Sequence, residues 1–381
     1  MFLALRELRF ARARFGLMGG VIALIAILMV LLSGLSSGLV NDGVSGLKAM
    51  PATAFAFNEG TKTDNAFSRS VVDESQAEAW RGQPGVEDVA LMGATMMNGA
   101  TGDGTQVDLS LFGVESDSFL APEIGEGRAS SAPHEIVVSS TGADEGLELG
   151  SVVTLDRIGT ELTVVGYTPG QATFGHVTIA YLPLPTWQYI AAGDAAPGMP
   201  TAADVAAEHR DTASTVALLA EDGADIDFAA GDEAAGTVTS SLKESFNASP
   251  GYSAETLTLQ MIQVFLYAIC ALVVGAFFTV WTVQRKHELA VLRAIGASTA
   301  YLLRDGLAQA AVILIGFTAL GVLAGLGMGS ALSGTAMPFA LEAAPIGLAT
   351  ALTILLGLIG AAAAIIRISR VDPLAALGGQ R

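Results

Sequence analysis

The sequence predicts an α-helical membrane protein in which four transmembrane helices carry a large α+β extracytoplasmic domain, inserted between the first and the second. Three observations support this fold class. The 381-residue chain is 51% hydrophobic and only 15% charged, which is unusual for a soluble protein. Four long runs contain no Asp, Glu, Lys or Arg, and most of the acidic residues fall in the one long segment between the first two runs.

Each uncharged run is long enough to cross a bilayer. A hydrocarbon core about 30 Å thick requires roughly 20 apolar residues in helical form. Only helices and closed barrels satisfy every backbone polar group in lipid. Pro338 interrupts the third run and predicts a helix end near Ser333. The four runs are residues 15–40, 256–284, 306–341 and 343–366.

The distribution of charge predicts the orientation. Residues 41–255 contain 8 Lys or Arg and 32 Asp or Glu, whereas the rest of the chain contains 11 basic and 5 acidic residues. The basic residues outside the domain gather in residues 1–14, in residues 285–304 and after residue 366. Because basic loops remain cytoplasmic, we expect both termini inside the cell and the acidic segment outside. The first run exceeds a typical signal-peptide core and lacks a clear cleavage site, so we expect an uncleaved signal anchor.

The acidic segment is long enough for one large domain or two small ones. The one cysteine of the chain, Cys270, lies in the second hydrophobic run, so the acidic segment cannot form an internal disulfide. Residues 221–236 are acidic and short of large apolar side chains, so they predict a loop or an exposed helix. Strand patterns occur in residues 104–114, 134–140, 151–157 and 161–168, and helical patterns in residues 73–81 and 202–209.

The acidic segment contains no recognisable catalytic pattern. Its histidines, His134, His176 and His209, stand singly, without a nucleophile elbow, a HExxH helix or a paired-cysteine spacing. We expect each of them to be exposed or to serve packing. Asp225 and Asp227 offer oxygen ligands to a divalent ion, but the residues around them do not form a calcium loop.

The loop between the second and third runs has a pattern of its own. In "RKHELAVLRAIGAS", residues 285–298, Leu289, Leu292 and Ile295 are spaced to form the apolar side of a helix on the membrane surface. Gly296 provides a stop for that helix. From composition alone, such a loop serves to fix the topology.

This loop closely resembles the cytoplasmic loop of the MacB and FtsX superfamily of ABC transporter permeases, whose pattern reads R-x-x-E-x-x-x-L-R-A-I-G-A. The resemblance extends over the whole chain, through "ALRELRFARAR" at the start, "GVEDVA", "LFGVESDSF" and "EIVVSS" in the acidic segment, and "RISRVDPLAALGG" near the end. It implies a coupling helix that seats in a cleft of a cytoplasmic ATPase. The residues expected to make that contact are Arg285, Glu288, Leu289, Leu292, Arg293 and Gly296.

The ATPase is expected to be a separate subunit, because the chain has no GxxxxGKS/T loop. ATP and Mg would bind that partner, and the chain is expected to be a transport subunit rather than an enzyme, with no cofactor of its own. The resemblance also implies a permease homodimer within a two-plus-two complex in the plasma membrane, with no nucleic-acid partner. Small residues suited to close helix packing, within one subunit or across the dimer, recur at Gly321, Gly325 and Gly329 and at Ser33, Gly34, Ser37 and Gly38.

The resemblance divides the chain into nine segments. Residues 1–15 form an amphipathic cytoplasmic helix, 16–40 the first span, 41–255 the extracytoplasmic domain, 256–284 the second span and 285–305 the coupling loop; residues 306–333 form the third span, 334–344 a short external hairpin, 345–367 the fourth span and 368–381 a cytoplasmic tail.

With one permease repeat and a free-standing ATPase, the layout is most similar to that of the haem-exporting HrtB permeases, which implies export of a hydrophobic compound, haem. A haem site requires an axial ligand and an apolar, aromatic cleft. Met29 is the candidate iron ligand, about 18 Å along the first helix and on the same side as Ser33. A methionine in such a helix more often serves packing. Further candidate substrate residues, expected to line an entrance from the outer leaflet, are Phe55, Phe57, Tyr252 and Tyr267.

Two alternative functions share this framework. An FtsX-like mechanotransmitter moves no solute and instead controls an extracytoplasmic cell-wall hydrolase, although its inserted domain is typically smaller. A lipoprotein-release permease extracts lipoproteins and requires an outer membrane. All three hypotheses imply the same topology, ATPase partner and dimer.

Overall fold

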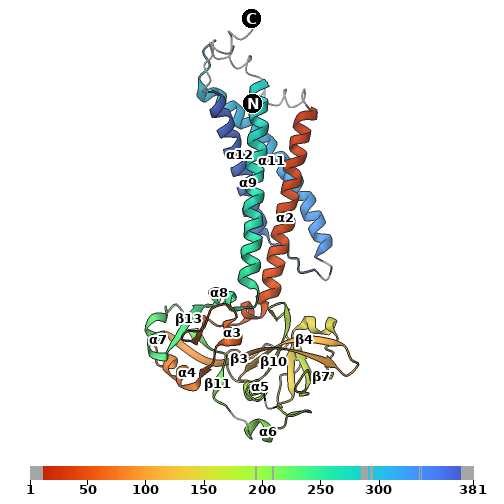
Figure 1. The fold of residues 1–381 in the computed structure, drawn as a ribbon, viewed down its shortest axis with the longest axis vertical. Coiled ribbons are helices and arrows are strands. Elements are labelled where there is room, and N and C mark those ends of the chain that lie inside the picture. Colours follow the sequence, from red (N-terminus) through yellow and green to blue (C-terminus); the bar gives the residue numbers. More distant parts are fainter. Residues whose placement is uncertain are drawn as a thin grey trace. The chain divides into compact units, whose positions relative to one another are not determined.

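The computed structural model describes residues 12–193, 195–207, 210–284, 291, 295–333, 335 and 337–369. The chain divides into two compact units. A helical unit comprises Met1–Leu39 and Thr256–Arg381, and a domain comprises Val40–Glu255. Figure 1 shows long helices in the first and a mixed sheet with short helices in the second. The predicted fold class is confirmed, with four candidate membrane helices and a large domain inserted between the first and the rest.

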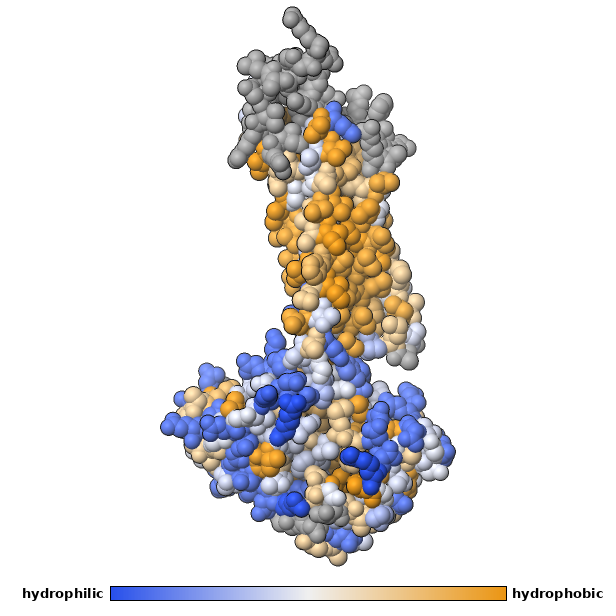
Figure 2. All heavy atoms as spheres, in the orientation of Figure 1, coloured by the Kyte–Doolittle hydropathy of each residue, from blue (hydrophilic) through white to orange (hydrophobic). Residues whose placement is uncertain are grey.

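The four long helices follow from the four uncharged runs. α2 extends beyond the predicted span and has non-helical backbone angles at Val44 (φ −146°, ψ 18°). The third long helix ends with Ser333 as its C-cap, so Pro338 lies outside it, as predicted. Figure 2 shows apolar side chains gathered over the helical unit, whereas hydrophilic ones predominate over the domain. The helices are α2 (Arg12–Ala49), α9 (Tyr252–Gln284), α11 (Thr299–Leu332) and α12 (Ala343–Ser369).

The predicted small-residue faces pack within the subunit. A Cβ atom built on Gly321 of α11 would lie 2.4 Å from the carbonyl oxygen of Ala23 on α2. One turn further along, a Cβ on Gly325 would lie 2.9 Å from Cβ of Val30. The glycines therefore let the two backbones approach closely, as small residues do in membrane helices.

The domain is built on one mixed sheet, in which β3 (Val86–Thr101) is the longest strand. The first half of β3 pairs antiparallel with β12 (Thr215–Ala220), and its second half pairs antiparallel with β4 (Gln106–Val114). β10 (Val177–Pro183) then lies parallel to β4. Among the described residues the strand order is β13-β1-β12-β3-β4-β10-β6-β8-β5, with β7 beside β3 and β8, and β9 beside β10.

All four predicted strand segments are strands of this sheet: β4, β6, β7 and β8. The other long strands, β1, β3, β10, β12 and β13, were not predicted from the sequence. The remaining strands are β1 (Ala54–Asn58), β5 (Glu126–Gly127), β6 (Glu135–Val138), β7 (Val152–Leu155), β8 (Glu161–Tyr167), β9 (Thr173–Phe174) and β13 (Thr237–Ser241); β2 (Val72–Asp73) and β11 (Thr212–Ala213) form a separate pair.

Both faces of the sheet are buried. Along β1, Ala54 and Ala56 belong to one cluster of buried side chains, whereas Phe55 and Phe57 belong to another. Successive strand residues point to opposite faces, so the two clusters cover the two sides of the sheet. Short helices complete the domain: α3 (Ala66–Arg69), α4 (Glu74–Arg81), α5 (Leu184–Ala191), α6 (Ala202–Ala207), α7 (Phe228–Ala235) and α8 (Leu242–Ser245), with 3-10 turns at Ser140–Glu145 (η1) and Phe246–Ala248 (η2).

The two predicted helices of the domain are present as α4 and α6. A capping box fixes the start of α4, because the Asp73 carboxylate accepts from the Gln76 backbone N–H while the Gln76 amide reaches back to Asp73. The acidic stretch 221–236 contains a short helix, α7, capped by Asp227. Gly231 of α7 packs on the ring of Trp80.

Gly321→Ala should destabilise the helical unit, because its methyl group would meet the backbone of α2. We expect a loss of about 1–3 kcal/mol, the usual cost of overpacking, measured by thermal unfolding of the full chain in detergent. Gly327→Ala is the matched control on the same helix, since a Cβ there has no neighbour within 4 Å. Equal stability of the two variants would contradict this account of the packing.

Candidate functional site

The predicted ATPase-coupling residues lie almost entirely outside the described residues. These are Arg285, Glu288, Leu289, Leu292 and Arg293. Gly296 is described, and it lies in an exposed turn with φ +106°, a conformation that favours glycine. The turn leads into α11, whose first turn is capped by the Ser298 hydroxyl. The structure thus supports Gly296 as the stop signal.

The candidate substrate residues of the helical unit are Met29, Ser33 and Tyr267. Met29 and Ser33 are each 2% exposed. Met29 belongs to a cluster of buried side chains drawn from all four helices, with Cys270 and Leu314 among its members, and Tyr267 is partly buried against the same cluster. In this conformation, Met29 packs inside the subunit.

The other three candidates belong to the domain. Phe55 and Phe57 on β1 are 0% and 4% exposed, and both rings contact Phe67 edge-on at 5.3 and 5.0 Å. The prediction that they line an outer-leaflet entrance is therefore corrected, because the sheet carries them into the domain core. Tyr252 begins α9, and its ring lies 6.1 Å from that of Phe246.

A tight hairpin of the domain holds the most unusual polar cluster. β9 and β10 pair with Phe174 opposite Val177, so only Gly175 and His176 form the loop. Both have positive φ, +60° and +64°, as the two-residue type I′ turn requires. Glycine adopts this conformation freely, but a histidine rarely does. Such a residue is often held there by its side-chain contacts.

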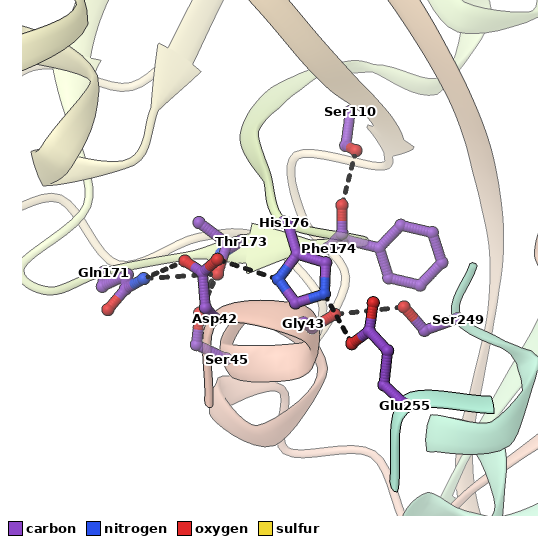
Figure 3. Close-up of polar contacts among 10 residues, drawn as sticks. All are labelled: Asp42, Gly43, Ser45, Ser110, Gln171, Thr173, Phe174, His176, Ser249 and Glu255. Carbon is purple, nitrogen blue, oxygen red and sulfur yellow. Dashed lines mark hydrogen bonds and ion pairs between the residues drawn. The ribbon is translucent and has the colours of Figure 1, made fainter. Parts of the chain in front are cut away.

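The His176 ring joins two helices that are far apart in the sequence (Figure 3). Its Nδ1 lies 2.9 Å from Oδ2 of Asp42, in the last turns of α2. Its Nε2 lies 2.9 Å from Oε2 of Glu255, in the first turn of α9. All three side chains are partly buried, with exposed fractions of 28%, 25% and 38% for His176, Asp42 and Glu255.

Further hydrogen bonds, all from donors that do not titrate, surround this bridge. The Gly175 N–H donates to the Gly43 carbonyl at 2.9 Å, and the Ser249 hydroxyl donates to the same carbonyl at 3.0 Å. The Thr173 N–H donates to Oγ of Ser45 at 2.9 Å. The Gln171 amide donates to Oδ1 of Asp42 at 2.9 Å. The end of α2 is therefore fixed to the hairpin through several side chains and backbone groups (Figure 3).

The geometry indicates the protonation state of His176. An ionised carboxylate only accepts hydrogen bonds, and a neutral imidazole carries one N–H. Two carboxylate contacts at 2.9 Å therefore fit the doubly protonated imidazolium. Burial lowers the pKa of His176, but the hydrogen bonds and charges of Asp42 and Glu255 outweigh it, so that its pKa is raised above the ordinary value of about 6.5.

A polar cavity of about 640 Å³ adjoins the bridge. Its walls include His176, Asp108 on β4, and Asp144 and Glu145 of η1. Burial raises the pKa of Glu145, although its carboxylate accepts a hydrogen bond from the Thr178 hydroxyl at 2.9 Å. The cavity thus presents carboxyl groups and one imidazole, without an apolar floor that would suit a porphyrin.

The described residues contain no group of three or more His, Cys, Asp or Glu side chains suited to a metal ion. Asp227, one of the two candidate ion ligands, instead accepts a hydrogen bond from the Ala230 N–H as the cap of α7. Of the histidines, His209 lies outside the described residues and His134 is partly buried. His176 is neither simply exposed nor a packing residue, which corrects the expectation for it.

The His176 bridge was not predicted because its partners lie 134 and 79 residues away in the sequence. One local signal was present: a Gly-His pair stands between two short β-branched and aromatic stretches, "ATF" and "VTIAYL". Such a pair is a two-residue hairpin signal. It predicts the turn but not the carboxylates that meet the ring.

Two family descriptions match the chain. Residues 14–232 match the description "MacB-like periplasmic core domain", and residues 261–373 match "FtsX-like permease C-terminal". A "Putative hemin transport system permease protein HrtB" of Staphylococcus haemolyticus is 24% identical over 384 residues, covering 100% of this chain and 99% of the relative. An "Uncharacterized ABC transporter permease" of Mycobacterium tuberculosis has the same identity and the same coverage.

Solved structures of related domains also match part of the chain. The periplasmic region of MacB from Actinobacillus actinomycetemcomitans is 13% identical, with a TM-score of 0.36, and the match covers 50% of this chain and 89% of that one. The extracellular domain of the transporter YknZ from Gram-positive bacteria is 15% identical, with a TM-score of 0.32, and the match covers 48% and 88%.

Asp42→Asn should lower the pKa of His176, because the substitution removes one of the two carboxylates that stabilise the imidazolium. The bridge stabilises the fold fully below the pKa of about 6.5 of an unfolded histidine and loses this effect as the pH rises through the higher folded pKa. NMR titration of ring-labelled histidine in the full chain measures the shift, since the chain has only four histidines. Asp64→Asn, in an exposed loop of the same domain, is the control. An unchanged His176 titration in Asp42→Asn would contradict the assignment.

Proposed function

The chain belongs to the MacB-like and FtsX-like family of ABC transporter permeases, and we propose that it is the membrane subunit of an efflux pump that expels haem with ATP hydrolysed by a separate subunit. The observation that supports haem as the cargo is the match to staphylococcal permeases named for hemin transport. Their identity to this chain is 24% and 25%, over 100% of its length.

The proposed orientation follows from the charges. The basic residues at the start, in the loop after α9 and after residue 366 support a cytoplasmic location of these three segments, with the acidic domain outside. Two copies of the chain pair with two ATPase subunits in the plasma membrane. The faces of α11 and α2 around Gly321 and Gly325 are occupied within one subunit, so a homodimer would form through other surfaces.

The loop that ends at Gly296 is the proposed contact with the ATPase. Its charged residues offer hydrogen bonds and ion pairs to a partner, while Leu289 and Leu292 supply an apolar contact. ATP and Mg bind the partner subunit, and the permease requires no cofactor. Closure of the ATPases on ATP would then move α9 and α11, which flank the loop.

Met29 is the proposed haem ligand, with Ser33 on the same side of α2. A thioether is a recognised axial ligand of haem iron. Since Met29 is buried among the four helices, its sulfur is reached only when α2 separates from its neighbours. Movement driven by ATP would thus alternately expose and cover the ligand. Tyr267 borders the same cluster and supplies aromatic surface beside it.

An FtsX-like mechanotransmitter is the second candidate function. The match of residues 261–373 to the FtsX-like permease description is common to both classes and favours neither. A mechanotransmitter needs a link between the membrane helices and the domain but no cargo site. Haem binding to the purified protein therefore separates the two functions.

Haem titration of the purified full chain should show saturable binding with a shifted Soret band, and Met29→Ala should abolish that shift by removing the axial sulfur. Met18→Ala is the matched control, because Met18 is also on α2, 2% exposed and in the same cluster. Absence of saturable binding in the parent would remove haem as the cargo and favour the mechanotransmitter. Equal binding by all three proteins would retain haem but discard Met29.

A further inference from the structure

We propose that His176 is a positioning residue that ties the C-terminal end of α2 to the N-terminal end of α9 through the β9–β10 hairpin and weakens this tie when it loses a proton. The tie itself is independent of the cargo. Its consequence for transport rests on the proposed function, because only a permease has to move these helices in each cycle.

The tie joins the two points at which the chain enters and leaves the domain. Asp42 belongs to α2 and Glu255 to α9, and both helices are candidate membrane spans. Asp42, His176 and Glu255 all belong to the same compact unit, Val40–Glu255. Any relative movement of the two helix ends must therefore lengthen at least one of the two 2.9 Å contacts of the His176 ring.

The ring is held in place by its own backbone. The loop has only two residues, both at positive φ, and Gly175 is bonded to the Gly43 carbonyl of α2. Bonds from Thr173 to Ser45 and from Gln171 to Asp42 fix the hairpin to α2 further. None of these three donors titrates, so this attachment is expected to persist when His176 loses its proton.

The link toward α9 contains a contact that depends on the proton. The contacts at this point include the His176–Glu255 bond, the Ser249–Gly43 bond and the ring contact between Phe246 and Tyr252. A neutral imidazole keeps one N–H and turns a lone pair toward the other carboxylate. One of the two charged contacts is then lost, while the uncharged contacts remain, so the link weakens without breaking.

The charged groups around the ring all favour the protonated form. Asp42 and Glu255 bond to it directly, and Asp108, Asp144 and Glu145 line the same cavity as His176. Lys48, the basic residue of this end of α2, donates to Asn41 at 3.4 Å. The hydrogen bonds and charges of Asp42 and Glu255 raise the pKa of His176, so the link toward α9 is expected to weaken above about pH 6.5.

Hydrogen–deuterium exchange of the full chain in nanodiscs tests the proposal at pH 6 and pH 9, with labelling times scaled to the intrinsic exchange rate. In the parent, the segment 252–258 should lose about tenfold protection at the higher pH, the effect of one hydrogen bond to a charged group, whereas the segment 40–49 should keep its protection. His176→Asn tolerates the left-handed backbone but is too short to bridge, so it should show the lower protection at both pH values.

Two further variants make the outcome decisive. Glu255→Gln offers an N–H donor to the neutral ring, so its protection should no longer depend on pH. His134→Asn, at a partly buried histidine of the same domain, should behave as the parent. The proposal is overturned if the parent shows no loss at high pH, if His176→Asn matches the parent, or if Glu255→Gln retains the parent's dependence on pH. None of these readouts requires haem or ATP, so they stand apart from any failure of the transport hypothesis.

Discussion

The central constraint on this structure is that a large domain is inserted into the helical unit and is joined to it covalently at two points of the chain. The chain enters the domain at the end of α2 and leaves it at the start of α9, so these two segments are the covalent connections between the domain and the helices. The imidazole of His176 lies between Asp42 and Glu255 and joins both segments to the central sheet through β10. A hydrogen bond between an imidazolium and a carboxylate in a partly buried site is strong and directional, and it changes when the imidazolium loses its proton.

This arrangement explains why a polar cluster occurs where the sequence offers only a tight turn. A two-residue hairpin with positive φ presents the His176 ring in a fixed direction, and the neighbouring uncharged bonds to Gly43 and Ser45 hold the hairpin against α2. The charged contacts can then change without dismantling the junction. In a permease driven by a separate ATPase, such a junction would connect movement of the helices with the domain while retaining the fold.

Much of the fold was predictable because the decisive signals are local. Bilayer-length uncharged runs predict the four long helices, and alternation predicts β4 and β6–β8. The missed strands β1, β10 and β12 and the middle of β3, residues 89–94, have mostly buried side chains on both faces, so they show no polar alternation in the sequence. The sequence also left open how Gly321 and Gly325 pack, since their spacing is the same within a subunit and across a dimer.

The site was less predictable, because its geometry is made by distant residues. Phe55 and Phe57 follow closely after the first span in sequence, which suggested an interfacial position, but β1 pairs between β12 and β13 and carries both rings into the core. Met29 and Ser33, which helical spacing puts on one side of α2, are both buried.

The most direct test of the account is haem transport by the permease reconstituted with its ABC ATPase subunit in liposomes, with a haem-accepting apoprotein on the side of the domain. The account predicts that ATP hydrolysis delivers haem to the acceptor, followed by its absorption band, and that a hydrolysis-deficient ATPase delivers none. ATP hydrolysis by the assembled complex without transfer of haem would contradict the central claim.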